Sequence, residues 1–351
     1  MGACVGNNLY VPPQLLFSIQ FVSMALHDTY HDPVLAAEVV ATLVQRSGIY
    51  VDGTLGGGSH SLALLQALQA QGLLESSLLI GIDQDSDALA MAAERLQAWQ
   101  PYTRLLKGNF RDMASLVQQL CDAEGRACAV TGVLLDLGVS SFQLDTAERG
   151  FSYMRSGPLD MRMDNTAPLT AAELINHADE AELARIFYHY GEEPRSRALA
   201  RAVVQQREKM GNFTTTEELA ALVRRLTHGG EKAVIKTLSR LFQALRIAVN
   251  DELGALHEVL EGALELLDGN GRLAVMSYHS LEDRVVKHFF THHAQCDWGP
   301  KGVALREPLS QGALTIVTKR PMLASADEIE RNPRARSAKL RVAAKNQPKT
   351  I

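Results

Sequence analysis

The 351-residue chain has only four cysteines, and no two of them form a Cys-x-x-Cys pair. This spacing argues against a structural zinc or disulfide framework, so a reducing, cytoplasmic compartment is expected. The chain also lacks an apolar run of the 18 or more residues that a membrane-spanning helix needs. Its first basic residue is Arg46, so the positive start of a secretory signal is missing too. We therefore expect no membrane association.

A loop containing Gly53 and Gly56 to Gly58 follows the apolar run Ile49–Val51. The loop lacks the lysine of a phosphate-binding P-loop, and Ser61 stands where a dinucleotide fingerprint needs its third glycine. A strand, a glycine loop and a helix nevertheless bring backbone N–H groups to the carboxyl edge of a sheet, where open α/β folds bind ligands. The sequence thus predicts a small nucleotide-like ligand there.

Acidic residues end the first two predicted strands, with Asp52 after the first and Asp83 after Leu78–Ile82. A carboxylate at the end of the second strand can accept both hydroxyls of a ribose, and one beside the glycine loop can hold a cationic group. This combination suits S-adenosylmethionine, which carries a sulfonium and an ammonium but no phosphate. The alternative is that each Asp merely caps the helix that follows it.

Further strands are predicted near residues 103–106, 133–136, 271–277 and 313–318, with helices between them, which indicates a parallel sheet covered on both faces. Residues 144–240 contain only helix-like stretches, among them Thr216 to Leu226, and the sheet domain is expected to resume with a helix from Phe242 to Leu253. Asp32 is expected to cap the helix that follows it, and Ser280 to open a capping box with Asp283. We therefore expect an α/β protein with an extension at 1–27 that is disordered, a sheet domain in two parts at 28–143 and 241–330, an all-helical insert at 144–240 and a basic segment at 331–351.

Asn109, Phe110 and Asp136 follow the third and fourth strands and should lie on the same sheet edge as the glycine loop. An aromatic ring there could stack on an adenine, and an acid could receive an amino group. The alternative is that Phe110 is an ordinary core residue.

Ordered motifs across the chain make it resemble the bacterial MraW-like family that methylates N4 of cytosine 1402 in 16S ribosomal RNA. The motifs are His31-x-Pro-Val-Leu, Asp52-Gly-Thr-Leu-Gly, Leu135-Asp-Leu-Gly-Val-Ser-Ser-x-Gln-Leu-Asp145, Glu148-Arg-Gly-Phe-Ser, Gly157-Pro-Leu-Asp-Met-Arg-Met-Asp, Phe242-Gln-Ala-Leu-Arg, His279-Ser-Leu-Glu-Asp and Asn332-Pro-Arg-Ala-Arg-Ser-Ala-Lys-Leu-Arg. The resemblance covers about residues 28 to 345. It implies a Rossmann-like S-adenosylmethionine methyltransferase sheet with an inserted helical substrate domain. The implied partner is 16S rRNA, within the small ribosomal subunit, and not DNA. Carried over by position, the implied cofactor contacts are Gly58, Ser59, His60, Asp83, Phe110, Asp136 and Gln143.

Three departures from the family pattern bear on these expectations. Ser59 stands where the family usually has glycine, and because serine resists positive φ a slight rearrangement of the loop is expected. The region 296–311 is short and lacks a cysteine cluster that some members carry, and residues 1–27 lie outside the pattern.

The net charge of −5 is uneven, because residues 331–351 hold seven basic residues and no acidic one. Such a segment is expected to contact RNA phosphates, although a solvated basic tail is the alternative. Arg197 and Arg201 share a predicted helical face in the insert and are either RNA contacts or ordinary ion-paired surface residues.

Other features leave the chemistry open. His288, His292, His293 and Cys296 have spacings that a metal could use, but nothing else supplies a coordination shell and we expect no metal site. His279 is either an active-site residue or a helix-start residue. The catalytic group that accepts the amino proton, and the oligomeric state, stay open; a homo-oligomer is possible. An RNA-binding assembly factor that holds S-adenosylmethionine without turnover, and a small-molecule methyltransferase, are the alternative functions.

Overall fold

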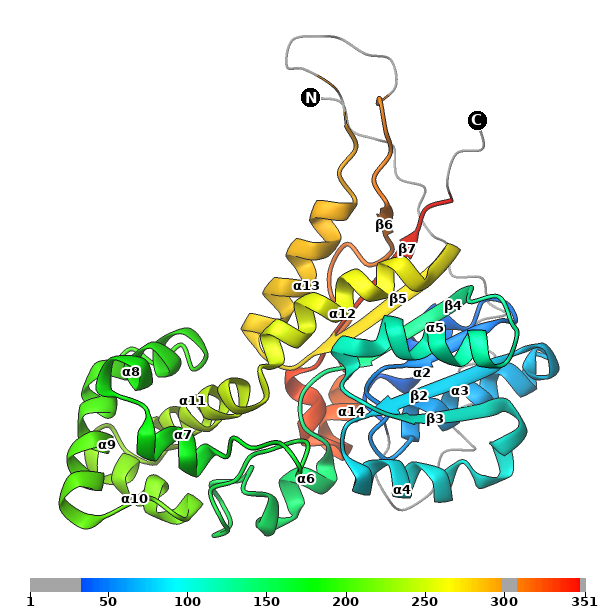
Figure 1. The fold of residues 1–351 in the computed structure, drawn as a ribbon. Helices are drawn as coiled ribbons and strands as arrows, with labels where there is room; N and C mark the ends of the chain where they lie inside the picture. The colour runs from blue at the N-terminus through cyan, green and yellow to red at the C-terminus, as the bar shows by residue number, and fades with distance from the viewer. Residues whose placement is uncertain (1–32, 298, 300–307, 348–351) are drawn as a thin grey trace.

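The computed structural model describes residues 33–297, 299 and 308–347, and its centre is one seven-stranded sheet (Figure 1). The strands lie in the order β3-β2-β1-β4-β5-β7-β6. Strands β1 to β5 pair in parallel, while β7 is antiparallel to both of its neighbours. Their bounds are Ile49–Asp52, Leu78–Asp83, Thr103–Lys107, Val130–Asp136, Leu267–Ser277, Leu314–Ile316 and Lys339–Lys345 for β1 to β7. The predicted Rossmann-like α/β sheet is confirmed.

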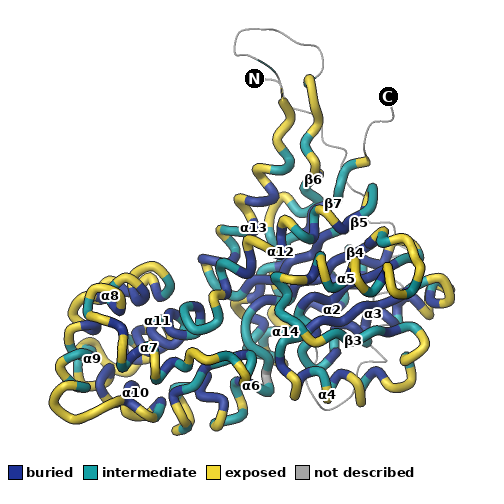
Figure 2. Tube along the Cα trace, viewed as in Figure 1, coloured by how far each residue is buried: buried dark blue, intermediate teal, exposed yellow. Residues whose placement is uncertain are grey.

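Both faces of the sheet are covered by helices because its strands carry apolar side chains on both sides. Val51, Ile80 and Leu135 point to one face, whereas Tyr50 and Leu79 point to the other. The first face packs against α5 (Met113–Ala123), α12 (Glu252–Leu266) and α13 (Ser280–His293), and the second against α2 (Ala36–Leu43), α3 (Ser59–Ala70) and α4 (Ser86–Arg95). Figure 2 shows the buried strands between these layers.

A separate helical domain, to one side in Figure 1, has its own hydrophobic core. It contains α7 (Ala171–His177), α8 (Glu180–His189), α9 (Ser196–Met210), α10 (Thr216–Leu226) and α11 (Glu231–Asn250). The boundary predicted at residue 240 falls inside α11 and is wrong, because Phe242 and Leu245 belong to the core of the helical domain. Residues 242–250 are helical as predicted, but they form the end of α11 rather than a separate helix from Phe242 to Leu253. The chain leaves α11 at Asp251, whose left-handed φ of 47° starts α12 in a new direction.

The basic C-terminal segment is not a tail, because its residues 339–345 form β7 inside the sheet. Leu340 and Val342 are fully buried there. The side chains of Lys339 and Arg341 both bind the carboxylate of Asp283 on α13, at 3.1 and 2.7 Å. These basic side chains therefore hold the sheet to a helix, and the expectation that they contact RNA phosphates is not supported.

Two helix starts differ from the sequence prediction. Helix α2 begins at Ala36 after Leu35 in a left-handed conformation, and the predicted cap Asp32 lies outside the described residues, as do residues 1–27. The capping box of α13 starts at His279 rather than Ser280: its ring accepts from the N–H of Glu282, whose side chain accepts from the N–H of His279. In the described part of the chain, no helix is both long and apolar enough to span a membrane.

Candidate active site

The glycine loop between β1 and α3 is shaped by two residues in the left-handed conformation, Gly56 at φ 51° and Gly58 at φ 78°. Ser59 is the first residue of α3 and does not have a positive φ. The positive φ that was the reason to expect a rearrangement of the loop is therefore absent. The Ser59 hydroxyl accepts a hydrogen bond from Arg95, which also donates to the carbonyl of Gly57 at 2.6 Å. These bonds tie the loop to α4.

Asp52 is a structural residue of this loop, because only 1% of its surface is exposed. It accepts a hydrogen bond from the hydroxyl of Ser61 at 2.7 Å and one from the N–H of Thr54. Burial raises its pKa. Asp52 does not line the cavity described below, so the suggested contact with a cationic ligand group is not supported.

Asp83 ends β2 and is held by backbone groups on both sides. Its two oxygens accept hydrogen bonds from the N–H groups of Gly56 and Asp85, each at 2.8 Å. Burial raises its pKa to about 6, although these two bonds lower it. The bonds leave acceptor capacity on both oxygens. The carboxylate is therefore oriented and can still accept hydroxyl groups.

Asp136 ends β4, and polar side chains from two other parts of the chain approach its carboxylate. Tyr278, just after β5, donates its hydroxyl to Oδ1 at 2.8 Å, and Nδ1 of His60 on α3 lies 3.4 Å from Oδ2. The other ring nitrogen of His60 donates to the carbonyl of Val34 at 2.9 Å. Burial raises the pKa of Asp136, while His60 and Tyr278 lower it. About 24% of the side-chain surface of Asp136 is exposed, so a ligand can reach it.

Gln143 belongs to a buried network that joins the loops around the site. Its amide donates to Asp85 Oδ2 at 3.0 Å, and the same oxygen accepts a hydrogen bond from Arg149 at 2.7 Å. Arg149 also donates to the carbonyls of Arg162 and Met163. Asp85 in turn caps α4 by accepting from the N–H of Asp87. Gln143 is thus fixed by groups from distant parts of the chain.

Asp83, Asp136 and Gln143 border one cavity of about 420 Å³ at the carboxyl edge of the sheet. Six of the seven predicted site residues line it, namely Ser59, His60, Asp83, Phe110, Asp136 and Gln143. Gly58 does not line it: a Cβ there would face Ala92 at 3.2 Å, so this glycine lets the loop pack on α4. The wall also includes Pro33 and Val34 and, from the C-terminal segment, Asn332, Arg334 and Ser337.

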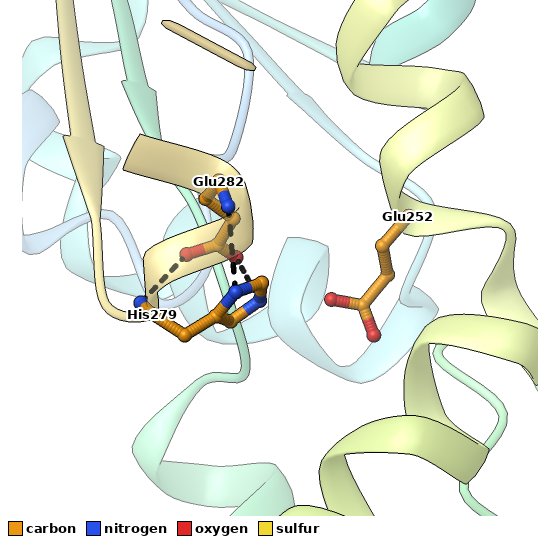
Figure 3. Close-up of side chains that lie close together, drawn as sticks. All are labelled: Glu252, His279 and Glu282. Atoms are coloured by element: carbon orange, nitrogen blue, oxygen red, sulfur yellow. Dashed lines mark hydrogen bonds and ion pairs between the residues drawn. The ribbon is translucent and has the colours of Figure 1, made fainter. Parts of the chain in front are cut away.

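A charged cluster that sequence reasoning missed forms another part of the wall. Arg246 on α11 binds both oxygens of Glu252 on α12, at 2.7 and 2.8 Å. Figure 3 shows the carboxylate of Glu252 facing the ring of His279 and Glu282 of α13. Although burial raises the pKa of Glu282, His279 and Arg246 hold it below its usual value. The only sequence signals for this cluster were the motifs containing Arg246 and His279–Asp283.

The cluster of Glu252, His279 and Glu282 has the donor types of a metal site, with ligand atoms within 4.8 Å of one another. The guanidinium of Arg246 already occupies both oxygens of Glu252 and supplies positive charge there. The ligand atoms of His288, His292, His293 and Cys296, which all lie in the described part of the chain, do not gather into such a cluster. His293 lies 3.5 Å from Glu261 of α12, and Cys296 is exposed beyond the end of α13.

Comparison with known proteins fits this geometry. The model of the MraW methylase family matches residues 28–346. Three relatives, each named ribosomal RNA small subunit methyltransferase H, are 59% identical in Pelodictyon phaeoclathratiforme, 58% in Chlorobium luteolum and 54% in Prosthecochloris aestuarii. The alignments cover 90, 91 and 92% of this chain and 95, 97 and 96% of the relatives. The chain therefore belongs to the MraW methylase family, and it is a methyltransferase whose cofactor is S-adenosylmethionine.

Proposed function

We propose that this protein transfers a methyl group from S-adenosylmethionine to N4 of cytosine 1402 in the 16S rRNA of the small ribosomal subunit, in the cytoplasm. The observation that carries the proposal is one cavity in which the glycine loop, Asp83 and Asp136 meet beside a separate helical domain. The family and the names of its relatives support rRNA as the substrate class. The specific cytosine comes from the resemblance of the sequence motifs.

The residues of the cavity fit the cofactor. Asp83 is oriented by two backbone N–H groups and has acceptor capacity left for two ribose hydroxyls. Phe110 follows the neighbouring strand, where its ring can pack on the adenine. Ser59, His60 and Gln143 line the same space, and Gly58 shapes the loop. We assign these residues to the cofactor-binding side of the cavity, and Asp136, which the resemblance places with them, to the border between the cofactor and the space for the target base.

The bound cofactor supplies an electrophilic methyl group on a sulfonium. The chain must then hold the target base and accept hydrogen from its amino group, because the lone pair of that nitrogen is delocalised into the ring. The carboxylate of Asp136 has free acceptor positions for this purpose, and the carboxylates of Glu252 and Glu282 also lie in the cavity wall. The cavity thus contains what transfer to an amine needs.

We assign RNA binding to the helical domain and to exposed basic residues near the cavity mouth. Arg336 is exposed in the short helix η5 (Pro333–Ser337), whose residues Arg334 and Ser337 line the cavity. Arg334 bridges both oxygens of Asp145 at 2.9 Å. In the insert, Arg201 pairs with Glu180, which favours a surface ion pair at that position.

The second candidate is a ribosome-assembly factor that binds S-adenosylmethionine without turnover. The exposed part of Asp136 favours catalysis, because a binding-only cavity has no need of an additional reachable acceptor. A small-molecule methyltransferase would have no use for the helical domain.

The test is to incubate the protein with S-adenosylmethionine and small ribosomal subunits that lack this modification, and to locate methyl groups by mass spectrometry of RNA fragments. We expect one methyl group on N4 of cytosine 1402. The matched control is Asp83→Asn, which should weaken cofactor binding and reduce methylation. Cofactor binding without transfer would support the assembly factor, and a methyl group at another nucleotide would overturn the assigned target.

A further inference from the structure

The position of Tyr278 is fixed at both ends. Its backbone N–H donates to Oε2 of Glu282 at 2.8 Å, and its hydroxyl donates to Oδ1 of Asp136 at 2.8 Å. Its ring packs against the core on the second face of the sheet, and it lines the cavity. Glu282 itself is buried and held by His279. The tyrosine thus connects a rigid helix start to the carboxylate in the cavity.

Asp136 is constrained by all its neighbours and yet remains reachable. Its backbone N–H donates to the hydroxyl of Thr54 at 2.6 Å, which fixes the end of β4. Tyr278 takes one carboxylate oxygen, and His60 lies beside the other at a distance longer than a usual hydrogen bond. The carboxylate therefore has one defined orientation and free acceptor positions.

We propose that Tyr278 is a positioning residue, which aims the carboxylate of Asp136 so that this carboxylate accepts the hydrogen bond and then the proton of the target amino group. The inference rests on the proposed function and names the acceptor that the sequence left open. In the reaction the nitrogen gains a bond to the methyl carbon while the bond between that carbon and the sulfonium sulfur breaks, its electron pair staying on the sulfur. The nitrogen then loses one bond to hydrogen, and Asp136 gains that proton. Tyr278 does not touch the base in this assignment.

The charges around Asp136 set the expected pH dependence. His60 of α3 is the neighbouring cation when it is protonated, whereas Asp52 of β1 and Glu282 of α13 are the neighbouring carboxylates. Tyr278 is the only hydroxyl donor to the carboxylate among the described residues. Burial raises the pKa of Asp136 and this donor lowers it, so loss of the hydroxyl should raise the pKa further.

The first experiment compares Tyr278→Phe with the intact protein, using unmethylated small subunits. We expect kcat to fall about 10- to 100-fold, the range for losing part of a general base. The dissociation constant for S-adenosylmethionine should stay within about threefold, and the acidic limb of the kcat profile should move up by about one pH unit, the size of one hydrogen bond to a charged group. The matched control is Tyr50→Phe, which removes a buried tyrosine hydroxyl outside the cavity and should leave all three quantities unchanged.

A second variant keeps the inference testable even if Tyr278→Phe fails to fold. Asp136→Asn should bind the cofactor but lose at least tenfold in kcat, and the double variant should lose little more than Asp136→Asn alone. An unchanged kcat and pH profile in Tyr278→Phe, a cofactor affinity that falls in proportion to kcat, or an active Asp136→Asn would each overturn the inference. Absence of methylation by the intact protein would instead refute the proposed function.

Discussion

Replacing Arg149 by methionine should strongly destabilise the protein, because this guanidinium neutralises a carboxylate deep inside the fold. Arg149 is 7% exposed and Asp85 is 2% exposed. Their bond of 2.7 Å joins the loop after α6 (Ser141–Asp145) to the start of α4, and two further bonds of Arg149 reach backbone carbonyls. Methionine has similar length but can make none of these three bonds.

The magnitude follows from these contacts. A hydrogen bond to a charged group contributes about 1.5–3 kcal/mol, and one to a neutral carbonyl is counted at about 1 kcal/mol. One bond to the carboxylate and two bonds to carbonyls give a loss of about 3.5–5 kcal/mol in the free energy of unfolding. This range agrees with the usual cost of removing one partner of a buried ion pair, which leaves the other charge uncompensated.

Urea unfolding followed by circular dichroism measures this loss. The matched control is Arg201→Met, which breaks an exposed ion pair with Glu180 and should cost less than about 1 kcal/mol. In a double-mutant cycle, Asp85→Asn should offset about 1–3 kcal/mol of the loss caused by Arg149→Met, because the residues are in contact. A loss below 1 kcal/mol for Arg149→Met, or strictly additive effects, would refute the reasoning.

Three further predictions concern the loop, the cofactor and the RNA. Gly58→Ala should lower the free energy of unfolding in urea by about 1–3 kcal/mol, because Gly58 has a φ of 78° and an added Cβ would press on α4. Gly57 has no positive φ, so Gly57→Ala should lower it by less than about 1 kcal/mol. Equal losses for the two variants would contradict this reasoning. Titration calorimetry should show the affinity for S-adenosylmethionine falling up to tenfold per pH unit below about pH 6 as Asp83 becomes protonated, and Asp83→Asn should remove this dependence; a decline of the same steepness in the variant would exclude Asp83 as its source. Arg336→Ala should weaken RNA binding and reduce the slope of log affinity against log salt by about one, while Arg341→Ala should lower stability through its pairing with Asp283; an unchanged salt slope for Arg336→Ala would place that side chain away from phosphates.

The parallel strands and the carboxyl edge were predictable from the sequence because their signals are local. Buried apolar runs that end on an acid marked β2 and β4, and the helix from Thr216 to Leu226 was predicted with its observed bounds. The strand-end residues Asp83, Phe110 and Asp136 meet because parallel strands align their carboxyl ends. The topology of the sheet was therefore sufficient to predict that these three residues lie together.

The features that sequence reasoning missed depend on long-range pairing. In strand β7 the basic residues Lys339 and Arg341 alternate with the buried residues Leu340 and Val342. Because this segment is rich in basic residues, the two-residue period of its apolar side chains was not recognised as a strand. The cluster around Arg246 joins three helices, and no local spacing reveals which acids a buried arginine will meet. The same holds for Tyr278, whose partner is 142 residues earlier in the chain.

The place of β7 in the sheet sets the order in which the molecule can be completed during synthesis. The strand lies between β5 and β6, yet it is made after every other strand. Until residues 339–345 are available, one edge of β5 has no partner, and an unpaired strand edge favours association with other chains. The hydrogen bond from the N–H of Leu35 to the carboxylate of Glu328 also cannot form until Glu328, 293 residues later in the chain, has been made. The helical domain, by contrast, is continuous in sequence with its own core and can fold while the sheet is still incomplete.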